Sequence, residues 1–350
     1  MNQFTVTNCR FTHGANTALL ALLLLCSQPL FAQQQEQPVA EPADSPALEL
    51  SLELSRELER RLQDIQRQES ELGLYHPALI EMYDDLARFY QEFGDHSQAV
   101  EMYRQALQLA RINTGLNSEQ QLPYIDRVIS SSLTLNDWQQ VDDMAHLRYY
   151  LKNKIYEPAD PRYASAVVEL GRWKLRVMRE NLLDEGARGL GNEAEDLSKI
   201  YRESIARIQA SPESNETSLL PLYQGKSQVD VAIARMLAET PYQFFEGSVS
   251  RYIYQSVCRN VRDAQGNVVR QCTQVQRENP RYRQSQRDNK RMMVYRSVRE
   301  VENSIQSLNG ILARNPGVPN QEREQIASQI RQLEVEFQRI ERNSRRSLLY

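Results

Sequence analysis

The stretch that decides the fold runs from residue 78 to residue 110 and reads ALIEMYDDLARFYQEFGDHSQAVEMYRQALQLA. Two runs with apolar residues at helical spacing lie on either side of Gly94-Asp95, a dipeptide typical of a turn. Small side chains in both runs would let two helices approach closely, and large ones would fill the space between their turns. The stretch therefore predicts a pair of packed, antiparallel helices.

This pair resembles a tetratricopeptide repeat, a family in which two antiparallel helices, A and B, carry large and small residues at set positions. Eight positions carry the resemblance: Tyr83, Leu86, Ala87 and Tyr90 in helix A, Gly94 in the turn, and Ala99, Tyr103 and Ala106 in helix B. The resemblance implies a concave groove, lined mostly by helix A residues, that holds a peptide or protein segment. It names no individual groove residue.

A period of 42 residues extends the pattern over residues 73–198. Three segments begin at Gly73, Gly115 and Glu157, and they open on His76-Pro77, Ser118-Glu119 and Asp160-Pro161. A fixed period of this size predicts a helical solenoid, in which each unit buries its apolar face by stacking on its neighbours. The length resembles the longer repeats of the kinesin-light-chain type more than the common form of about 34 residues.

The later segments depart from the family pattern and could be more divergent helix pairs. In the second, Ser132 and Arg148 stand where Tyr and Ala are expected. In the third, an insertion at 183–191 displaces helix B to 193–209, with these residues inward: Ala194, Leu197, Tyr201, Ile205 and Ile208. A further helix at 219–240 is expected as a fourth helix A or as a capping helix. The TPR-like repeats are thus assigned to residues 73–247.

A β-hairpin is expected at 248–279, because strand-forming residues flank the turn 263–267. Pairing Asp263 with Asn267 places Cys258 opposite Cys272. These are the two cysteines left once a signal peptide is removed, so a disulfide is predicted. Their separation is unlike Cys-x-x-Cys, which favours a structural bond over a redox site.

The N-terminal segments predict export. Residues 1–32 read as a signal peptide, whose apolar run is too short for a membrane span. Cys26 lacks the small preceding residues of a lipobox. Residues 33–46 are expected to form a disordered linker, and 47–72 an amphipathic helix. The predicted location is the bacterial periplasm.

Residues 280–350 predict a basic helical hairpin, an antiparallel coiled coil. Apolar residues recur at alternating spacings of three and four on both sides of 314–320. The basic run contains Arg281, Arg283, Arg287, Lys290 and Arg291. From residue 250 onward the chain holds 19 Arg and Lys against 10 Asp and Glu, whereas 33–249 hold 22 against 36. The run could contact an anionic lipid or wall polymer, form a solvated helix face, or dock on the acidic repeats. Export argues against nucleic acid.

No catalytic, cofactor-binding or metal-ligating residue is predicted. The three histidines of the exported chain, His76, His96 and His146, have no clustered ligands beside them. The sequence contains no Walker loop, Gly-x-Ser-x-Gly or His-Glu-x-x-His motif. With a mean hydropathy of −0.62, the chain is expected to be a mostly α, non-catalytic protein–protein interaction scaffold of the cell envelope. The alternative is an envelope assembly factor that forms a homo-oligomer through its coiled coil.

Overall fold

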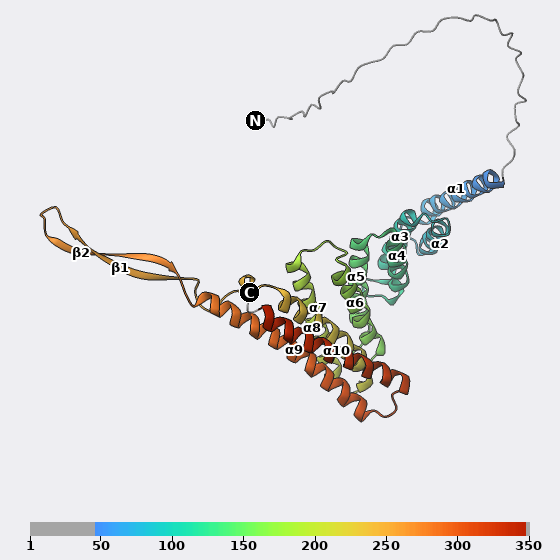
Figure 1. The fold of residues 1–350 in the computed structure, drawn as a ribbon. Coiled ribbons are helices and arrows are strands. Elements are labelled where there is room, and N and C mark those ends of the chain that lie inside the picture. The colour runs from blue at the N-terminus through green and yellow to red at the C-terminus, as the bar shows by residue number, and fades with distance from the viewer. Residues whose placement is uncertain (1–45, 348–350) are drawn as a thin grey trace, which may run out of the picture. The chain divides into compact units, whose positions relative to one another are not determined.

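The computed structural model describes residues 46–347, so the predicted signal peptide and nearly all of the predicted linker lie outside the described residues. Within that range the chain is mostly helical, with a two-stranded antiparallel sheet (Figure 1). Its α-helices are α1 Pro46–Leu72, α2 Ala78–Glu92, α3 His96–Thr114, α4 Leu122–Leu135, α5 Trp138–Ile155, α6 Pro161–Glu180, α7 Ala187–Ala210, α8 Leu220–Glu239, α9 Tyr282–Arg314 and α10 Asn320–Ser347. The strands are β1 Tyr252–Arg262 and β2 Val268–Glu278, and the 3-10 helices are η1 Glu119–Gln121, η2 Glu216–Leu219 and η3 Tyr242–Phe244.

From α2 to α8 each helix packs against the next one along the chain. One apolar core runs from Leu107 in α3 through α4–α8 and on into α9 and α10. Two smaller clusters join α1, α2 and α3 to the start of that core. The predicted helices at 78–110 are both present, and the small residues Ala87, Ala99 and Ala106 are fully buried between them.

The turns inside the first two helix pairs have the same geometry. Gly94 and Asn136, 42 residues apart, both adopt positive φ, of 77° and 56°. The residue after each one, Asp95 or Asp137, caps the following helix by accepting a hydrogen bond from the backbone N–H three residues on, at 3.1 Å in both cases. An aspartate at this position satisfies one of the free N–H groups at a helix start.

The three predicted segment openings also share one geometry. His76 Nδ1, Ser118 Oγ and Asp160 Oδ1 each accept a hydrogen bond from the backbone N–H two residues on, at 3.2, 3.2 and 2.8 Å. Different side chains thus perform the same turn every 42 residues. Asn215 makes the same bond to the N–H of Thr217, at 3.0 Å, immediately before η2 and α8. The same bond before α8 indicates that α8 is the first helix of a further pair, as α2, α4 and α6 are.

α7 begins earlier than the sequence predicts. The expected second helix covers 193–209, whereas α7 covers Ala187–Ala210, so the last part of the predicted insertion is helical. The loop before it contains Asn181 and Asp184 at positive φ. The five residues predicted to face inward from this helix are all buried.

Tyr201 of α7 holds α6, α7 and α8 together. Its side chain is 1% exposed and its hydroxyl lies where a Cβ atom on either Gly171 or Gly225 would overlap it. Gly171 belongs to α6 and Gly225 to α8. Because both positions are glycine, the Tyr201 ring fits between α6 and α8. Burial raises the pKa of Tyr201, so the hydroxyl stays neutral.

The hairpin has the predicted register. In every pair along the ladder the two residue numbers add up to 530, as they do for Asp263 and Asn267. The ladder runs from Tyr252 opposite Glu278 to Arg262 opposite Val268, and Cys258 lies opposite Cys272. The Asp263 N–H donates to the Asn267 carbonyl at 2.9 Å, and Gly266 has a φ of 84° in the three-residue loop between them. The predicted disulfide is confirmed.

α9 ends and α10 begins at the predicted connection, residues 314–320, but the two helices do not form a self-contained pair. α8 packs against both of them and buries their apolar seams, with Val298, Leu308, Ile326 and Ile330 at most 7% exposed. The seam predicted to support oligomerisation is therefore covered by a helix of the same chain.

Replacing Gly171 or Gly225 with alanine should lower the free energy of unfolding by about 2 kcal/mol, because the new methyl group overlaps the Tyr201 ring. Denaturant unfolding followed by circular dichroism measures this change. Gly310→Ala in α9 is the matched control, since its Cβ would meet only the flexible end of Arg314. That variant should be neutral or more stable by up to about 1 kcal/mol. Equal effects at all three sites would contradict the packing described.

Candidate interaction surfaces

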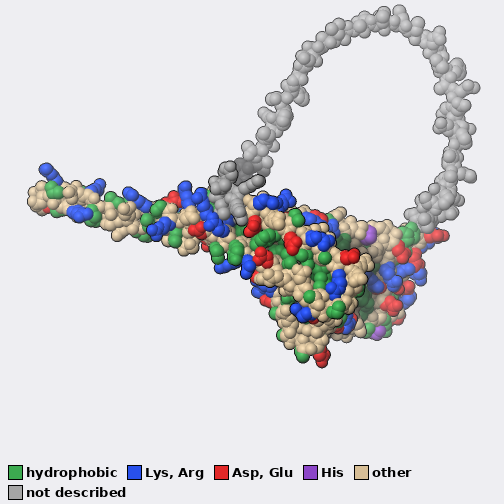
Figure 2. Space-filling model, turned by 60° about the horizontal axis from the view of Figure 1, so that its bottom comes forward, with side chains coloured by type: hydrophobic (Ala, Val, Ile, Leu, Met, Phe, Trp, Pro, Cys, Tyr) green, Lys and Arg blue, Asp and Glu red, His purple; other side chains and the backbone are tan. Residues whose placement is uncertain are grey.

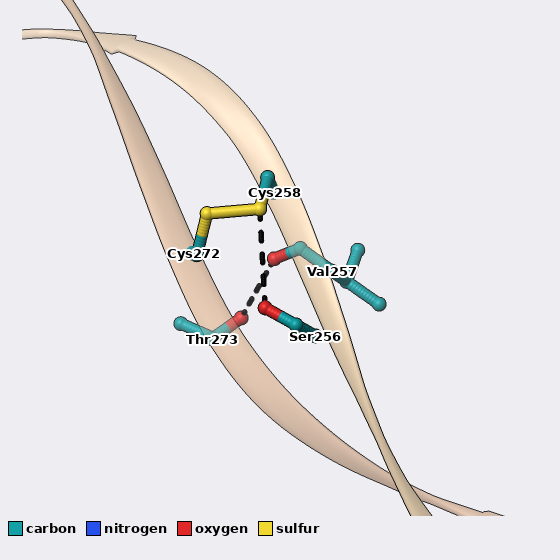
Figure 3. Close-up of a disulfide and its surroundings, with 5 residues drawn as sticks. All are labelled: Ser256, Val257, Cys258, Cys272 and Thr273. Atoms are coloured by element: carbon teal, nitrogen blue, oxygen red, sulfur yellow. Dashed lines mark hydrogen bonds between the residues drawn. A yellow bond between two sulfur atoms is a disulfide. The ribbon is translucent and has the colours of Figure 1, made fainter.

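The hairpin is exposed along its whole length. Every strand residue is exposed except Cys258 and Val261, which are half-buried. The disulfide joins a directly opposed pair whose Cα atoms are 3.9 Å apart (Figure 3). Beside it, the Thr273 hydroxyl reaches the Val257 carbonyl at 3.5 Å. A two-stranded hairpin is marginally stable alone, so the disulfide, rather than packing against a core, stabilises this one.

The predicted basic run does not form one surface. Lys290 is fully buried, and its ammonium donates to the carbonyls of Ala238 and Thr240 at 2.9 and 2.6 Å, where α8 ends. Burial lowers the pKa of Lys290. Arg287 lies over the Tyr242 ring at 4.6 Å. Lys290 is thus a capping group of α8 rather than a contact for an anionic partner, a correction to the predicted run.

Three arginines of that run, Arg281, Arg283 and Arg291, are exposed. They continue a series that begins on the hairpin, where five more exposed arginines are found: Arg251, Arg259, Arg262, Arg270 and Arg277. These arginines recur along the hairpin in the space-filling view, where basic side chains are blue (Figure 2). The basic character of the C-terminal part is therefore concentrated at and beside the hairpin.

Charge asymmetry does not explain how the C-terminal helices dock on α8. Lys226 of α8 binds Glu300 of α9 at 2.8 Å, and Arg235 of α8 binds Glu336 of α10 at 2.9 Å. In both pairs the cation comes from the acidic part of the chain and the carboxylate from the basic part. Glu216 with Arg314 is the pair with the expected signs. Shape and apolar burial decide the docking.

The repeat residues predicted from the sequence lie at the interface between α2 and α3. Leu86, Ala87 and Tyr103 are at most 1% exposed, and the Tyr103 hydroxyl donates to Gln91 at 2.9 Å. Tyr83 is half-buried and its hydroxyl donates to Glu69 of α1 at 2.7 Å. Burial, followed by this bond, raises the pKa of Tyr83 to about 12. These residues hold the helices together and are not free for a partner.

Ion pairs that the sequence did not predict link α2 directly to α4, and α4 to α6 through α5. Arg127 of α4 pairs with Asp84 of α2, although Asp84 is only 6% exposed. In the next step Arg148 of α5 pairs with Asp126 of α4 at 2.8 Å and with Glu169 of α6 at 3.4 Å. Arg148 is one of the residues that departs from the family pattern, and these two carboxylates account for a cation at that position.

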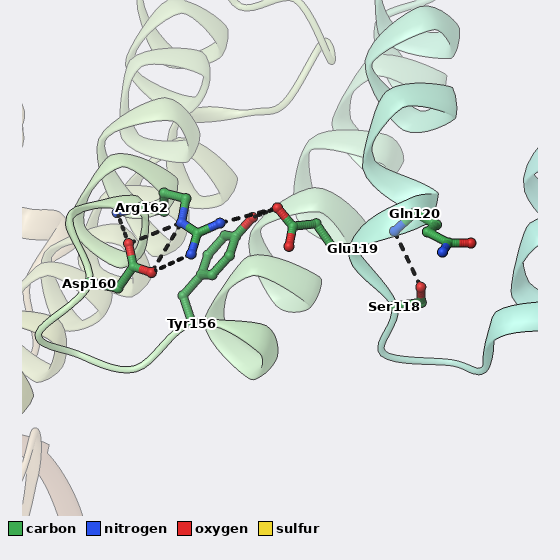
Figure 4. A network of polar contacts seen from close by, with 6 residues as sticks. All are labelled: Ser118, Glu119, Gln120, Tyr156, Asp160 and Arg162. Carbon is green, nitrogen blue, oxygen red and sulfur yellow. Dashed lines mark hydrogen bonds and ion pairs between the residues drawn. The ribbon is translucent and has the colours of Figure 1, made fainter.

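A second polar contact joins the openings of the second and third segments (Figure 4). Arg162 binds both Asp160 and Glu119, and its guanidinium lies over the Tyr156 ring at 4.0 Å. The Tyr156 hydroxyl donates to the same Glu119 carboxylate at 2.9 Å. Hydrogen bonds from the Arg162 side chain and backbone lower the pKa of Asp160. The contact ties the start of α6 to η1.

Two buried polar clusters lie deeper in the helical part. In one, Asp142 accepts from Trp173 Nε1 at 2.7 Å and binds Lys174 at 2.9 Å. Burial opposes the charge of Lys174, yet hydrogen bonds to Asp142 and Glu193 raise its pKa. In the other, Asp230 binds Lys226 at 2.7 Å, and burial raises its pKa. Each of these ions has partners of opposite charge, so both clusters are structural.

A cleft of about 480 Å³ opens beside the second cluster, between α7, α8 and α9. Its walls include Arg202, Arg296 and Arg299 together with apolar Leu237 and Met293.

The histidines take part in no reactive arrangement in the described structure. His76 is a turn acceptor, His96 begins α3, and His146 Nε2 lies 3.6 Å from Asp142. Among the described residues, no three His, Cys, Asp or Glu side chains gather as they would around a metal ion. None of the described helices combines the length and apolar character needed to cross a membrane.

Comparison with known proteins shows only weak likeness. No family model matches the chain, and no curated protein is significantly similar to it in sequence. Among solved structures, the putative kinesin light chain TPR-like repeats of Podosopora anserina align with 53% of this chain and 81% of their own, at 16% identity and a TM-score of 0.35. BtubC (BKLC) of P. vanneervenii aligns with 51% of this chain and 71% of its own, at 16% identity and a TM-score of 0.30. Scores this low carry no argument, so the repeat assignment rests on the turn geometry described above.

Replacing Lys290 with methionine should lower the free energy of unfolding by about 2 kcal/mol, because two buried carbonyls at the end of α8 lose their donor. Arg291→Met is the matched control: the neighbouring residue is exposed, so its loss should change stability by less than about 0.5 kcal/mol. Chemical denaturation of both variants measures the difference. A larger loss at Arg291 than at Lys290 would contradict the assignment.

Proposed function

We propose that this chain is a non-catalytic protein-interaction scaffold, a solenoid of TPR-like units that binds an extended segment of a partner along its first helices. The observation that carries the proposal is the opening turn repeated at His76, Ser118 and Asp160. Because these turns are equivalent, the segments that lead into α2, α4 and α6 begin alike every 42 residues, although η1 precedes α4. Aligned helices of this kind form a continuous surface across several units.

Ion pairs that link α2, α4 and α6 support this surface. Asp84 with Arg127 joins α2 to α4, and Arg148 of α5 bridges Asp126 of α4 and Glu169 of α6. These pairs, in which at least one partner is buried or half-buried, restrain the distance between neighbouring helices, which reduces the conformational entropy lost when a partner binds. The α2–α6 part is therefore suited to receive a peptide as a largely preformed groove.

The envelope location remains part of the proposal and rests on the N-terminal sequence. The disulfide agrees with it, because disulfides persist in oxidising compartments such as the periplasm and are rare in the cytosol. The alternative of an assembly factor that oligomerises through its coiled coil is less favoured, since α8 covers the seams of α9 and α10.

The groove can be tested by placing a photo-crosslinking amino acid at Arg88, Ser130 and Arg172, one variant at a time. These positions are exposed, lie 42 residues apart and belong to α2, α4 and α6. In cells of the source organism, all three should capture the same protein, and the product should survive a high-salt wash. The matched controls are Arg104 of α3 and His146 of α5, which are also exposed and 42 residues apart.

Capture at the first-helix positions and not at the second-helix controls is the expected result. Capture that is equal at both sets, or confined to the second helices, would place the binding surface elsewhere and refute the groove. Deleting residues 281–350 is a poorer test than these point variants, because it would uncover the apolar core that α8 shares with α9 and α10.

A further inference from the structure

The two faces of the hairpin differ in composition, since most of its β-branched residues lie on one of them. Side chains on one face come from odd-numbered residues of both strands, including six β-branched ones: Ile253, Val257, Val261, Val269, Thr273 and Val275. The other face carries the disulfide, Tyr252, Tyr254 and Val268 together with polar residues such as Ser256, Asn260, Gln274 and Gln276. Alternation of period two is typical of a strand with one face against protein and one against solvent.

The β-branched face contacts no core in the described structure. Ile253, Val257, Val269 and Val275 are between 38% and 42% exposed. The apolar side chains of this face are interrupted by polar ones, since Arg259 lies opposite Gln271 between the Val257–Thr273 and Val261–Val269 pairs. Uncovered apolar side chains with polar neighbours are typical of an interaction site. The disulfide holds this face in one conformation before any partner arrives, which lowers the entropic cost of binding.

The net positive charge of the hairpin indicates the charge of the partner. Between residues 251 and 278 there are five arginines against two acidic residues. Asp263 is occupied by the turn, where it accepts from the N–H groups of Gln265 and Asn267, and Glu278 lies at the base, 4.0 Å from Arg283. Two of the arginines, Arg259 and Arg277, stand on the β-branched face itself. A partner surface that matches this face is both apolar and acidic.

Two other occupants fit the face less well. A second copy of the hairpin would bring its own arginines against these, a like-charge contact that costs energy. A lipid surface favours aromatic residues on the inserted face. Here Tyr252 and Tyr254 lie on the opposite face, whereas Arg259 and Arg277 would have to enter the bilayer with the valines.

We propose that the β-branched face of the hairpin is a second docking surface, separate from the repeat groove, that binds an acidic polypeptide segment with alternating apolar side chains. The valines supply apolar contact, and Arg259 and Arg277 pair with carboxylates of the segment. The site lies outside the repeats, so the chain can hold two partner segments at once.

The test uses the full chain and a short fluorescein-labelled peptide that alternates valine with glutamate. A peptide with lysine in place of glutamate is the specificity control. Fluorescence anisotropy should show binding of the acidic peptide and at least about tenfold weaker binding of the basic one. Arg259→Gln with Arg277→Gln should weaken binding of the acidic peptide by about tenfold or more.

The matched control is Arg262→Gln with Arg270→Gln, which removes the same charge from the opposite face. It should weaken binding less than about threefold at physiological salt, because a rim charge acts mainly at long range. Mass spectrometry confirms that each variant keeps its disulfide. Equal losses in the two double variants would refute a face-specific site.

Vesicles of phosphatidylglycerol provide a second arm. Co-sedimentation with these vesicles but no binding of the acidic peptide would assign the face to lipid and overturn the proposal. Neither arm depends on crosslinking at Arg88, Ser130 or Arg172, so this surface and the repeat groove can fail separately.

Discussion

The helical part depends on one local constraint, the side-chain hydrogen bond that opens each unit. An acceptor at residues 76, 118 and 160 turns the chain so that the N–H two residues on is satisfied, and a first helix starts beside it. Imidazole, hydroxyl and carboxylate all do this, because the turn needs only an acceptor at a fixed distance from the backbone. Since every unit begins with the same turn, each helix pair stacks on the next one in a similar way.

The end of the repeats is set by α8. Its opening at Asn215 matches the earlier ones, and α9 packs along it, but the hairpin is inserted between these two helices. α10 then covers the apolar face that α8 and α9 leave open. The C-terminal helices are thus the closing layer of the same core, whereas the hairpin adds no core and is held by its disulfide. This division separates a stable body from an exposed arm.

Much of this could be predicted from the sequence, where local chemistry decides. The period, the turn at Gly94, the hairpin register and the disulfide follow from residues close in sequence or from simple pairing. What required the structure was long-range: the burial of Lys290 against α8 and the covering of the tail by α8. A basic residue beside other basic residues is expected to be exposed, and only the fold shows that Lys290 donates hydrogen bonds to two carbonyls. The early start of α7 was missed because two of its first five residues are glycines.

The central claim is that residues 76–180 are built from equivalent 42-residue units, and deletion of one unit tests it most directly. Removing residues 118–159 joins Asn117 to Asp160, so one opening turn replaces another. Thermal unfolding followed by circular dichroism should remain a single cooperative transition, because each unit contacts only its neighbours. Removing 118–151 instead, a deletion of about 34 residues, the length of the common tetratricopeptide unit, should abolish that transition. If both deletions unfold alike, or if the 42-residue deletion alone loses cooperativity, the units are not equivalent and the account is wrong.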